Sequence, residues 1–174
     1  MLPGRDEEIV TLDALFRDCV SGRGGVAVIR GPVTSGKTTL LEAFAEWTVA
    51  AGAVSLGAVA SRAERGLPFG VLDQLFRGRQ LPAAIATRVA GLLAELLASQ
   101  AGTGSQAGQA GQAGQAGEDP QAVSSVQARA FDGLLGVLAE LSEVRPLVIT
   151  VDDIQYADVA SLQCLSYLDR KSVV

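Results

Sequence analysis

The chain of 174 residues contains no histidine. Histidine is the commonest protein ligand of zinc and haem, and it is the usual base beside a nucleophilic serine or cysteine. Its absence excludes such sites from this sequence. Carboxylates, lysine, hydroxyls and a bound cofactor are left to carry any chemistry.

Cysteine and long apolar runs are also scarce. Cys19 and Cys164 are the two cysteines of the chain, too few for a disulfide framework and too far apart for a zinc knuckle. We interpret them as packing thiols of a cytoplasmic protein. No stretch approaches 18 uninterrupted apolar residues, and the first residues lack a basic start followed by an apolar run. The sequence therefore predicts neither a membrane span nor a leader peptide.

Basic residues show no excess, since the formal net charge is −5. A nucleic-acid-binding face needs clustered lysine and arginine, so we expect no nucleic acid to bind to this segment. The hydrophobic content of 48% is enough for a sizeable core. A chain of this length and composition predicts one globular domain.

Apolar spacing predicts the elements of the first third of the chain. Residues 6–20 have the period of an amphipathic helix with acidic residues in its first turn. The apolar run Val26–Arg30 is suited to a buried parallel strand, and residues 37–51 have helical spacing. Residues 53–60 are predicted as a second strand. The order strand, loop, helix, strand is that of a βαβ unit.

The rest of the chain is predicted to be mainly helical. Residues 67–98 indicate helix in two pieces that separate near Pro82, and residues 121–141 indicate a long helix. Between them, residues 101–119 form a low-complexity tract of Ala-Gly-Gln triplets, which we expect to be a flexible surface loop. Residues 147–151 predict a third buried strand, and Asp158 is placed to cap a final helix.

One loop carries the strongest chemical signal. Residues 31–38 read Gly-Pro-Val-Thr-Ser-Gly-Lys-Thr, between a predicted strand and a predicted helix. Glycine permits tight turns, so successive N–H groups can converge on phosphate oxygens at a helix start. The alternative is an ordinary glycine-rich turn with a coincidental lysine. The residues expected to bind the phosphates of ATP are Gly31, Thr34, Ser35, Gly36, Lys37, Thr38 and Thr39.

Two acids after the third predicted strand complete the expected site. We expect Lys37 to reach the β- and γ-phosphates and the Thr38 hydroxyl to bind Mg²⁺. Asp152 would hold the same ion through water, because the carboxyl ends of parallel strands form the ligand-binding edge of a sheet. Asp153 is the candidate catalytic residue, polarising the attacking water. The alternative for both acids is that they end the strand for solubility alone.

Four segments, spread over almost the whole chain, share a further pattern: Gly4–Glu8 with Leu12 and Leu15; the strand and loop through Glu42; Leu67–Phe76; and Val151–Asp158 with Ser161 and Leu162. Together they resemble the N-terminal ATPase domain of the large ATP-binding regulators of the LuxR type. These regulators belong to the STAND branch of AAA-like P-loop ATPases. The segment Leu67–Phe76 is the most family-specific part, since many NTPases share the phosphate loop.

The chain departs from this family at two places. Val33-Thr34-Ser35-Gly36 stands where the family often has Ala-Gly-Ile-Gly, and Gln155 replaces a frequent histidine. Neither change removes an expected phosphate or Mg²⁺ contact. The resemblance also places Gly4-Arg5 near the adenine side of the nucleotide.

The resemblance implies a nucleotide switch with ATP and Mg²⁺ as cofactors. ATP binding would control self-association of the full-length parent, or the exposure of a C-terminal helix-turn-helix that binds promoter DNA. Hydrolysis would be slow at most, and only in a complete domain. Two alternatives stay open at this point: a fragment of a P-loop motor or DNA-repair ATPase, and a non-functional truncated fragment that does not fold stably.

The expected fold is α/β, a three-layer P-loop NTPase with a mostly parallel sheet that is incomplete at its C-terminal end. In the resembled family, a later strand separates the strand before the phosphate loop from the strand that ends in Asp152. We therefore expect residues 1–168 to be a partial ATPase domain. Residues 169–174 match a translated sequencing adapter and are interpreted as a non-native tail; a genuine basic helix end is the alternative.

Overall fold

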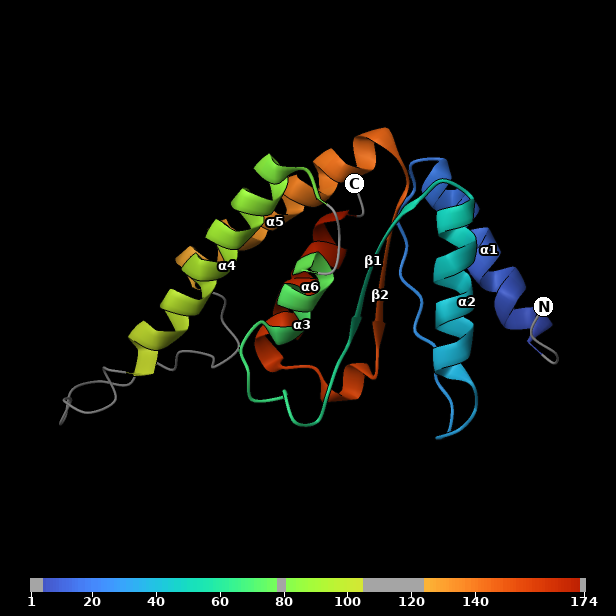
Figure 1. The fold of residues 1–174 in the computed structure, drawn as a ribbon, viewed down its shortest axis with the longest axis horizontal. Coiled ribbons are helices and arrows are strands. Elements are labelled where there is room, and N and C mark those ends of the chain that lie inside the picture. Colours follow the sequence, from blue (N-terminus) through green and yellow to red (C-terminus); the bar gives the residue numbers. More distant parts are fainter. Residues whose placement is uncertain (1–4, 78–80, 105–123, 173–174) are drawn as a thin grey trace.

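The computed structural model describes residues 5–77, 81–104 and 124–172. In these residues the chain forms six α-helices, one 3₁₀ turn and two strands (Figure 1). The elements are α1 Asp6–Val20, α2 Lys37–Ala50, β1 Val54–Val59, α3 Gly70–Arg77, α4 Ala83–Gly104, α5 Ser125–Val144, β2 Leu147–Asp152, η1 Ile154–Tyr156 and α6 Val159–Ser172.

Strands β1 and β2 pair in parallel. Val54 lies opposite Leu147, and the register continues to Val59 opposite Asp152. The Ala60 amide then donates to the Asp152 carbonyl oxygen at 3.0 Å, which extends the pairing past the end of β1. The strands predicted over residues 53–60 and 147–151 are confirmed.

The strand predicted over Val26–Arg30 is wrong. The sheet formed by the described residues holds only β1 and β2, and residues Val26 and Val28 are 65% and 66% exposed. In Figure 1 the segment runs in extended form between β2 and α2. A parallel strand needs a hydrogen-bonded neighbour, and the strand beside β2 is β1. The βαβ unit expected over residues 26–60 is consequently absent.

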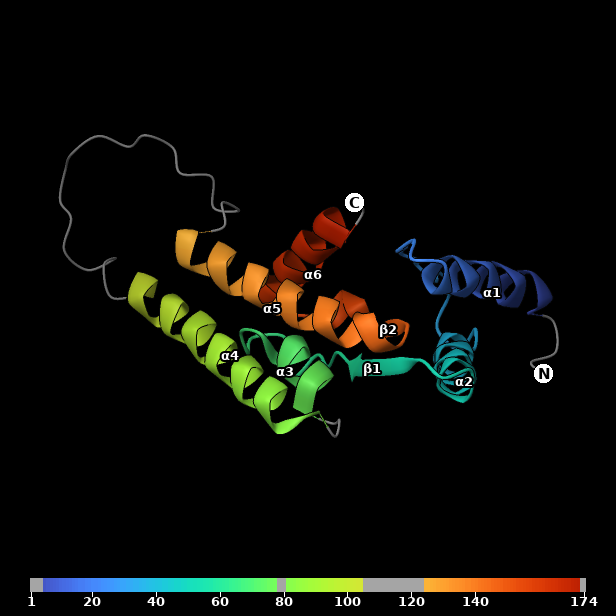
Figure 2. The ribbon, with the colours of Figure 1, turned by 90° about the horizontal axis from the view of Figure 1, so that it is seen from above.

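The helices lie in two groups about the strands. Figure 2 shows β1 and β2 between the α1–α2 pair and the group made by α3, α4, α5 and α6. The hydrophobic core lies on the side of the second group, where Phe69, Leu72 and Phe131 are almost or fully buried. The rings of Phe69 and Phe131 meet edge to face, with centroids 6.5 Å apart. The structure thus has the α/β class and a parallel pair of strands.

The helix predictions are confirmed with shifted ends. Two helices, α3 and α4, replace the range 67–98, and α5 begins after Ser124 with a capping box to Gln127. The flexible loop predicted over residues 101–119 is wrong for residues 101–104, which continue α4. The rest of that range, with the triplet tract, lies outside the described residues. Helix α6 continues through Asp169 to Ser172. Within the described ranges, none of the helices is both long and apolar enough to cross a bilayer.

Candidate phosphate-binding site

The loop before α2 has an unusual backbone. Thr34 and Gly36 have φ angles of +68° and +77°. Gly36 is the N-cap of α2, and no side chain caps this helix end. Helix N-termini present free N–H groups and the positive end of the helix dipole. The loop therefore delivers the chain to an uncapped, anion-attracting helix start.

Gly31 and Ser35 face each other across this loop. A Cβ atom on Gly31 would lie only 2.7 Å from the Ser35 hydroxyl oxygen, so a side chain at position 31 would collide with it. The Ser35 hydroxyl is buried and has no hydrogen-bond partner in the described part of the chain. An unpaired buried hydroxyl is costly, and a phosphate oxygen would satisfy it. Both features fit the phosphates of a nucleotide.

Lys37 lies back over the loop. Its ammonium donates to the carbonyl oxygens of Gly31 at 3.1 Å and Pro32 at 2.8 Å. An ammonium has three N–H groups, so these two bonds leave one more donor for an anion. The Thr34 hydroxyl donates to the neighbouring Val33 carbonyl oxygen. Thr34 can therefore contribute to the site through its backbone N–H group.

The structure brings Arg5 to the loop, a contact that sequence reasoning missed. A Cβ atom on Gly36 would lie 3.8 Å from a terminal nitrogen of Arg5. The guanidinium is oriented by Glu8, to which it donates at 2.6 Å. A second cation thus lies beside the loop. The signal available in the sequence was the Gly4-Arg5 pair itself.

The two acids lie at the end of β2. Asp153 has a φ of +50°, its amide donates to the Asp152 carboxylate at 2.8 Å, and its own carboxylate accepts from the Gln155 amide at 2.8 Å. Figure 1 shows the end of β2 and the phosphate loop at the same end of the molecule.

No cluster of three His, Cys, Asp or Glu side chains that could hold a metal occurs among the residues described.

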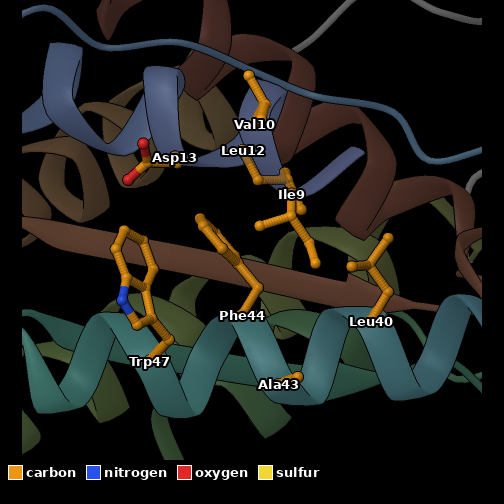
Figure 3. Close-up of a pocket in the computed structure, with 8 residues that line it drawn as sticks. All are labelled: Ile9, Val10, Leu12, Asp13, Leu40, Ala43, Phe44 and Trp47. Atoms are coloured by element: carbon orange, nitrogen blue, oxygen red, sulfur yellow. The ribbon is translucent and has the colours of Figure 1, made fainter. Parts of the chain in front are cut away.

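An apolar groove of about 360 Å³ lies between α1 and α2. Figure 3 shows Phe44 rising from α2 towards Leu12 and Ile9 of α1, Trp47 rising towards Asp13, and Leu40 at the other end. Leu40 stands one turn after Lys37, so the groove begins close to the phosphate loop. Trp47 is 43% exposed and packs edge to face on Phe16, with ring centroids 5.1 Å apart.

One of the comparisons with known proteins identifies a family. The sequence model of the AAA ATPase domain family matches residues 1–172. Neither a curated protein nor a solved structure matches the chain. The family match spans the phosphate loop, both strands and the acidic pair. On this evidence, the chain belongs to the AAA ATPase domain family.

Proposed function

We propose that this chain binds Mg-ATP as the nucleotide-switch domain of a cytoplasmic signalling ATPase, a LuxR-type transcriptional regulator. The observation that carries the nucleotide is the phosphate loop, with its buried unpaired Ser35 hydroxyl and uncapped helix start. Membership of the AAA ATPase domain family supports the same assignment. The regulator role is supported by the sequence of Leu67–Phe76, which resembles that family most closely.

Each residue of the loop has a proposed task. The amides of Gly31, Thr34, Gly36 and the first turn of α2 bind phosphate oxygens, and Ser35 donates its hydroxyl. Lys37 exchanges its contacts with loop carbonyl oxygens for the β- and γ-phosphates. This exchange preserves the number of hydrogen bonds while pairing the ammonium with a full negative charge.

Thr38 and Asp152 are the proposed protein ligands of Mg²⁺, Asp152 through water. Bound Mg²⁺ neutralises charge that develops on the β- and γ-phosphates. Asp153 orients the attacking water. The side-chain amide of Gln155 donates a hydrogen bond to the Asp153 carboxylate. We place the adenine at the end of the groove formed by Ile9 and Leu40, where an aromatic base would cover apolar side chains.

We further propose that residues 1–168 are part of a larger, three-layer ATPase domain and that residues 169–174 are a non-native tail. In this arrangement a further strand lies between Val26–Arg30 and β2. The extended, unpaired form of residues 26–30 supports this, as does Ile149 on β2, which is 36% exposed. An apolar parallel strand is normally covered on both faces.

The test of nucleotide binding is the Lys37→Ala variant. Charge-assisted hydrogen bonds contribute about 1.5 to 3 kcal/mol, so the affinity for Mg-ATP measured by calorimetry should fall at least about tenfold. Lys171→Ala is the matched control, because Lys171 is the other lysine of the chain and lies on α6 beside Tyr167. Unchanged affinity in Lys37→Ala would refute the assignment of the phosphate loop.

A further inference from the structure

Asp158 caps two helices with one carboxylate. It is only 4% exposed. One oxygen, Oδ1, accepts from the Ser161 amide at 2.8 Å, the bond that caps α6. The same oxygen accepts from the Phe69 amide at 2.9 Å, and Oδ2 accepts from the Val71 amide at 3.4 Å. Asp158 therefore also accepts hydrogen bonds from backbone amides at the start of α3, almost ninety residues earlier in the chain.

Further bonds fasten α3 to the same region. The Leu72 amide donates to the Ser161 hydroxyl oxygen at 3.3 Å. The Gln74 side chain accepts from the Val59 amide at 3.0 Å, at the carboxyl end of β1. The segment Leu67–Phe76 is the most family-specific part of the sequence. Hydrogen bonds thus join it to the carboxyl end of β1 and to the N-terminal end of α6. Apolar packing of α3 would not require the polar side chains of Asp158, Ser161 and Gln74.

Asp152 and Asp153, the acidic pair, begin the segment that ends at Asp158. The Ala60 amide holds the Asp152 carbonyl oxygen at the near end of this turn. The turn then closes on itself through the bond from the Tyr156 amide to the Asp153 carbonyl oxygen at 2.8 Å. Asp158 anchors its far end. We call residues 152–158 the acidic turn.

Two backbone positions beside this anchor are strained. Phe69 has a φ of +61° and Asp153 a φ of +50°, in the left-handed region that residues other than glycine rarely adopt. Such conformations persist only where the surrounding structure imposes them. The Asp158 carboxylate binds the Phe69 amide directly, and it ends the turn that contains Asp153.

We propose that Asp158 is a positioning residue for the acidic pair: by fixing the acidic turn to α3, it sets the orientation of Asp152 and Asp153 towards the Mg²⁺ of the bound nucleotide. This inference rests on the proposed function. It also gives the Leu67–Phe76 segment a task, since the Phe69 and Val71 amides hold the carboxylate in place.

The variant Asp158→Asn tests the role with Mg²⁺ as the probe. Asparagine keeps the shape and one acceptor, but its NH₂ group faces an N–H donor. We expect the Mg²⁺ concentration for half-maximal ATP binding to rise at least fivefold, while ATP affinity in EDTA changes less than twofold. Ser124→Ala is the control, because it removes the cap of α5 on another part of the structure. It should lower stability and leave the Mg²⁺ requirement unchanged.

Hydrogen exchange of the nucleotide-free protein provides a second readout. In Asp158→Asn, the amides of residues 69–72 and 154–157 should exchange faster together, and in Ser124→Ala neither group should. If Asp158→Asn does not fold, Ser161→Ala removes only the bond from the Leu72 amide and should produce smaller changes in the same direction.

The outcomes separate the two proposals. If the wild type binds Mg-ATP and Asp158→Asn has the same Mg²⁺ requirement, the positioning role is overturned. If ATP affinity in EDTA falls as much as affinity with Mg²⁺, Asp158 has a merely structural role, which also overturns the proposal. If the wild type binds no nucleotide, the proposed function fails and the Mg²⁺ role falls with it. In that case, faster exchange confined to residues 69–72 overturns the link to the acidic turn as well.

Discussion

Helices α3 to α6 and the pair α1–α2 flank the same two strands, but they are held to them differently. On the first side, which we call the core side, β1 and the four helices share one continuous cluster of buried apolar residues. Hydrogen bonds to the side chains of Asp158 and Gln74 add to this packing. On the second side, the loop side of residues 5–50, Leu12, Phe16 and Leu40 are buried outside that cluster. Much of the remaining apolar surface of the loop side is exposed.

This difference gives the two groups of proposed nucleotide contacts different local stabilities. Local opening costs least free energy where few apolar contacts are buried. The acidic turn belongs to the core side, while the phosphate loop belongs to the loop side. A nucleotide that contacts both would add its binding free energy to the weaker side and join it to the stronger one. Such an arrangement suits a switch whose state depends on the ligand.

The largest expected contrast comes from removing one aromatic ring on each side. Phe131 is fully buried between Phe69 and Tyr167, so Phe131→Ala should lower the free energy of unfolding by about 3 to 5 kcal/mol. Trp47→Ala should cost less than half as much, because Trp47 lies open to the groove. Urea denaturation of both variants measures this, and equal losses would show that the two sides are equally well packed.

Cys164 should make the stability of the protein sensitive to alkali. Burial raises the pKa of Cys164 to about 12, whereas an unfolded thiol ionises near pH ~8.5. Above that pH the unfolded state releases a proton that the folded state keeps, so stability falls as the pH rises towards the folded pKa. The expected loss is roughly 1 to 2 kcal/mol between pH ~8 and ~10. Denaturation at both pH values measures it, and Cys164→Ala should lack this part of the loss.

Labelling supplies the comparison for the same prediction. Cys19 is half-buried on the loop side, where its thiol donates to the Leu147 carbonyl oxygen at 3.8 Å. An alkylating reagent should therefore modify Cys19 before Cys164. Modification of Cys164 at the same rate would show that the core side opens as readily as the loop side.

Extending the chain tests whether the loop side becomes part of the sheet. A longer chain that supplies the proposed strand between residues 26–30 and β2 should bind Mg-ATP at least about tenfold more tightly, which is ~1.4 kcal/mol. Calorimetry and thermal melting of both lengths measure this, with Lys37→Ala in the longer chain as control. A 174-residue chain that is monomeric, cooperatively folded and equally tight for Mg-ATP would contradict the proposal.

The two acids should separate binding from hydrolysis. Asp152→Asn should raise the Mg²⁺ requirement of ATP binding several-fold, because it removes the negative charge of the carboxylate. The side-chain oxygen of asparagine can still accept the hydrogen bond from the Asp153 backbone amide. Asp153→Asn should slow any hydrolysis and leave binding nearly unchanged. Magnesium titrations and phosphate release from the two variants measure these effects. Identical nucleotide parameters in both would remove the separate roles.

The smallest effect is expected from shortening the triplet tract. Deleting residues 106–117 changes mainly the entropy of closing the connection between α4 and α5, by less than ~1 kcal/mol. The melting temperature of the deletion variant should therefore stay close to that of the full chain. A large fall would show that the tract contributes to the packing of the core side.

Local pattern determined most of the elements. Helical spacing predicted α1 and α2, alternating and apolar runs predicted β1 and β2, and Asp158 was predicted as the cap of α6 because a cap depends on residues close in sequence. The proposal of a phosphate loop rests on local pattern too, since its glycines and Lys37 lie within a few residues of one another.

Only the tertiary structure decided what depends on distant partners. Val26–Arg30 has the composition of a strand, yet a strand exists only where a neighbour supplies hydrogen bonds, and the described residues offer it none. The exposure of Trp47 depends on how α1 packs across α2. The second role of Asp158 joins residues almost ninety positions apart, and no periodicity or local spacing encodes such a contact.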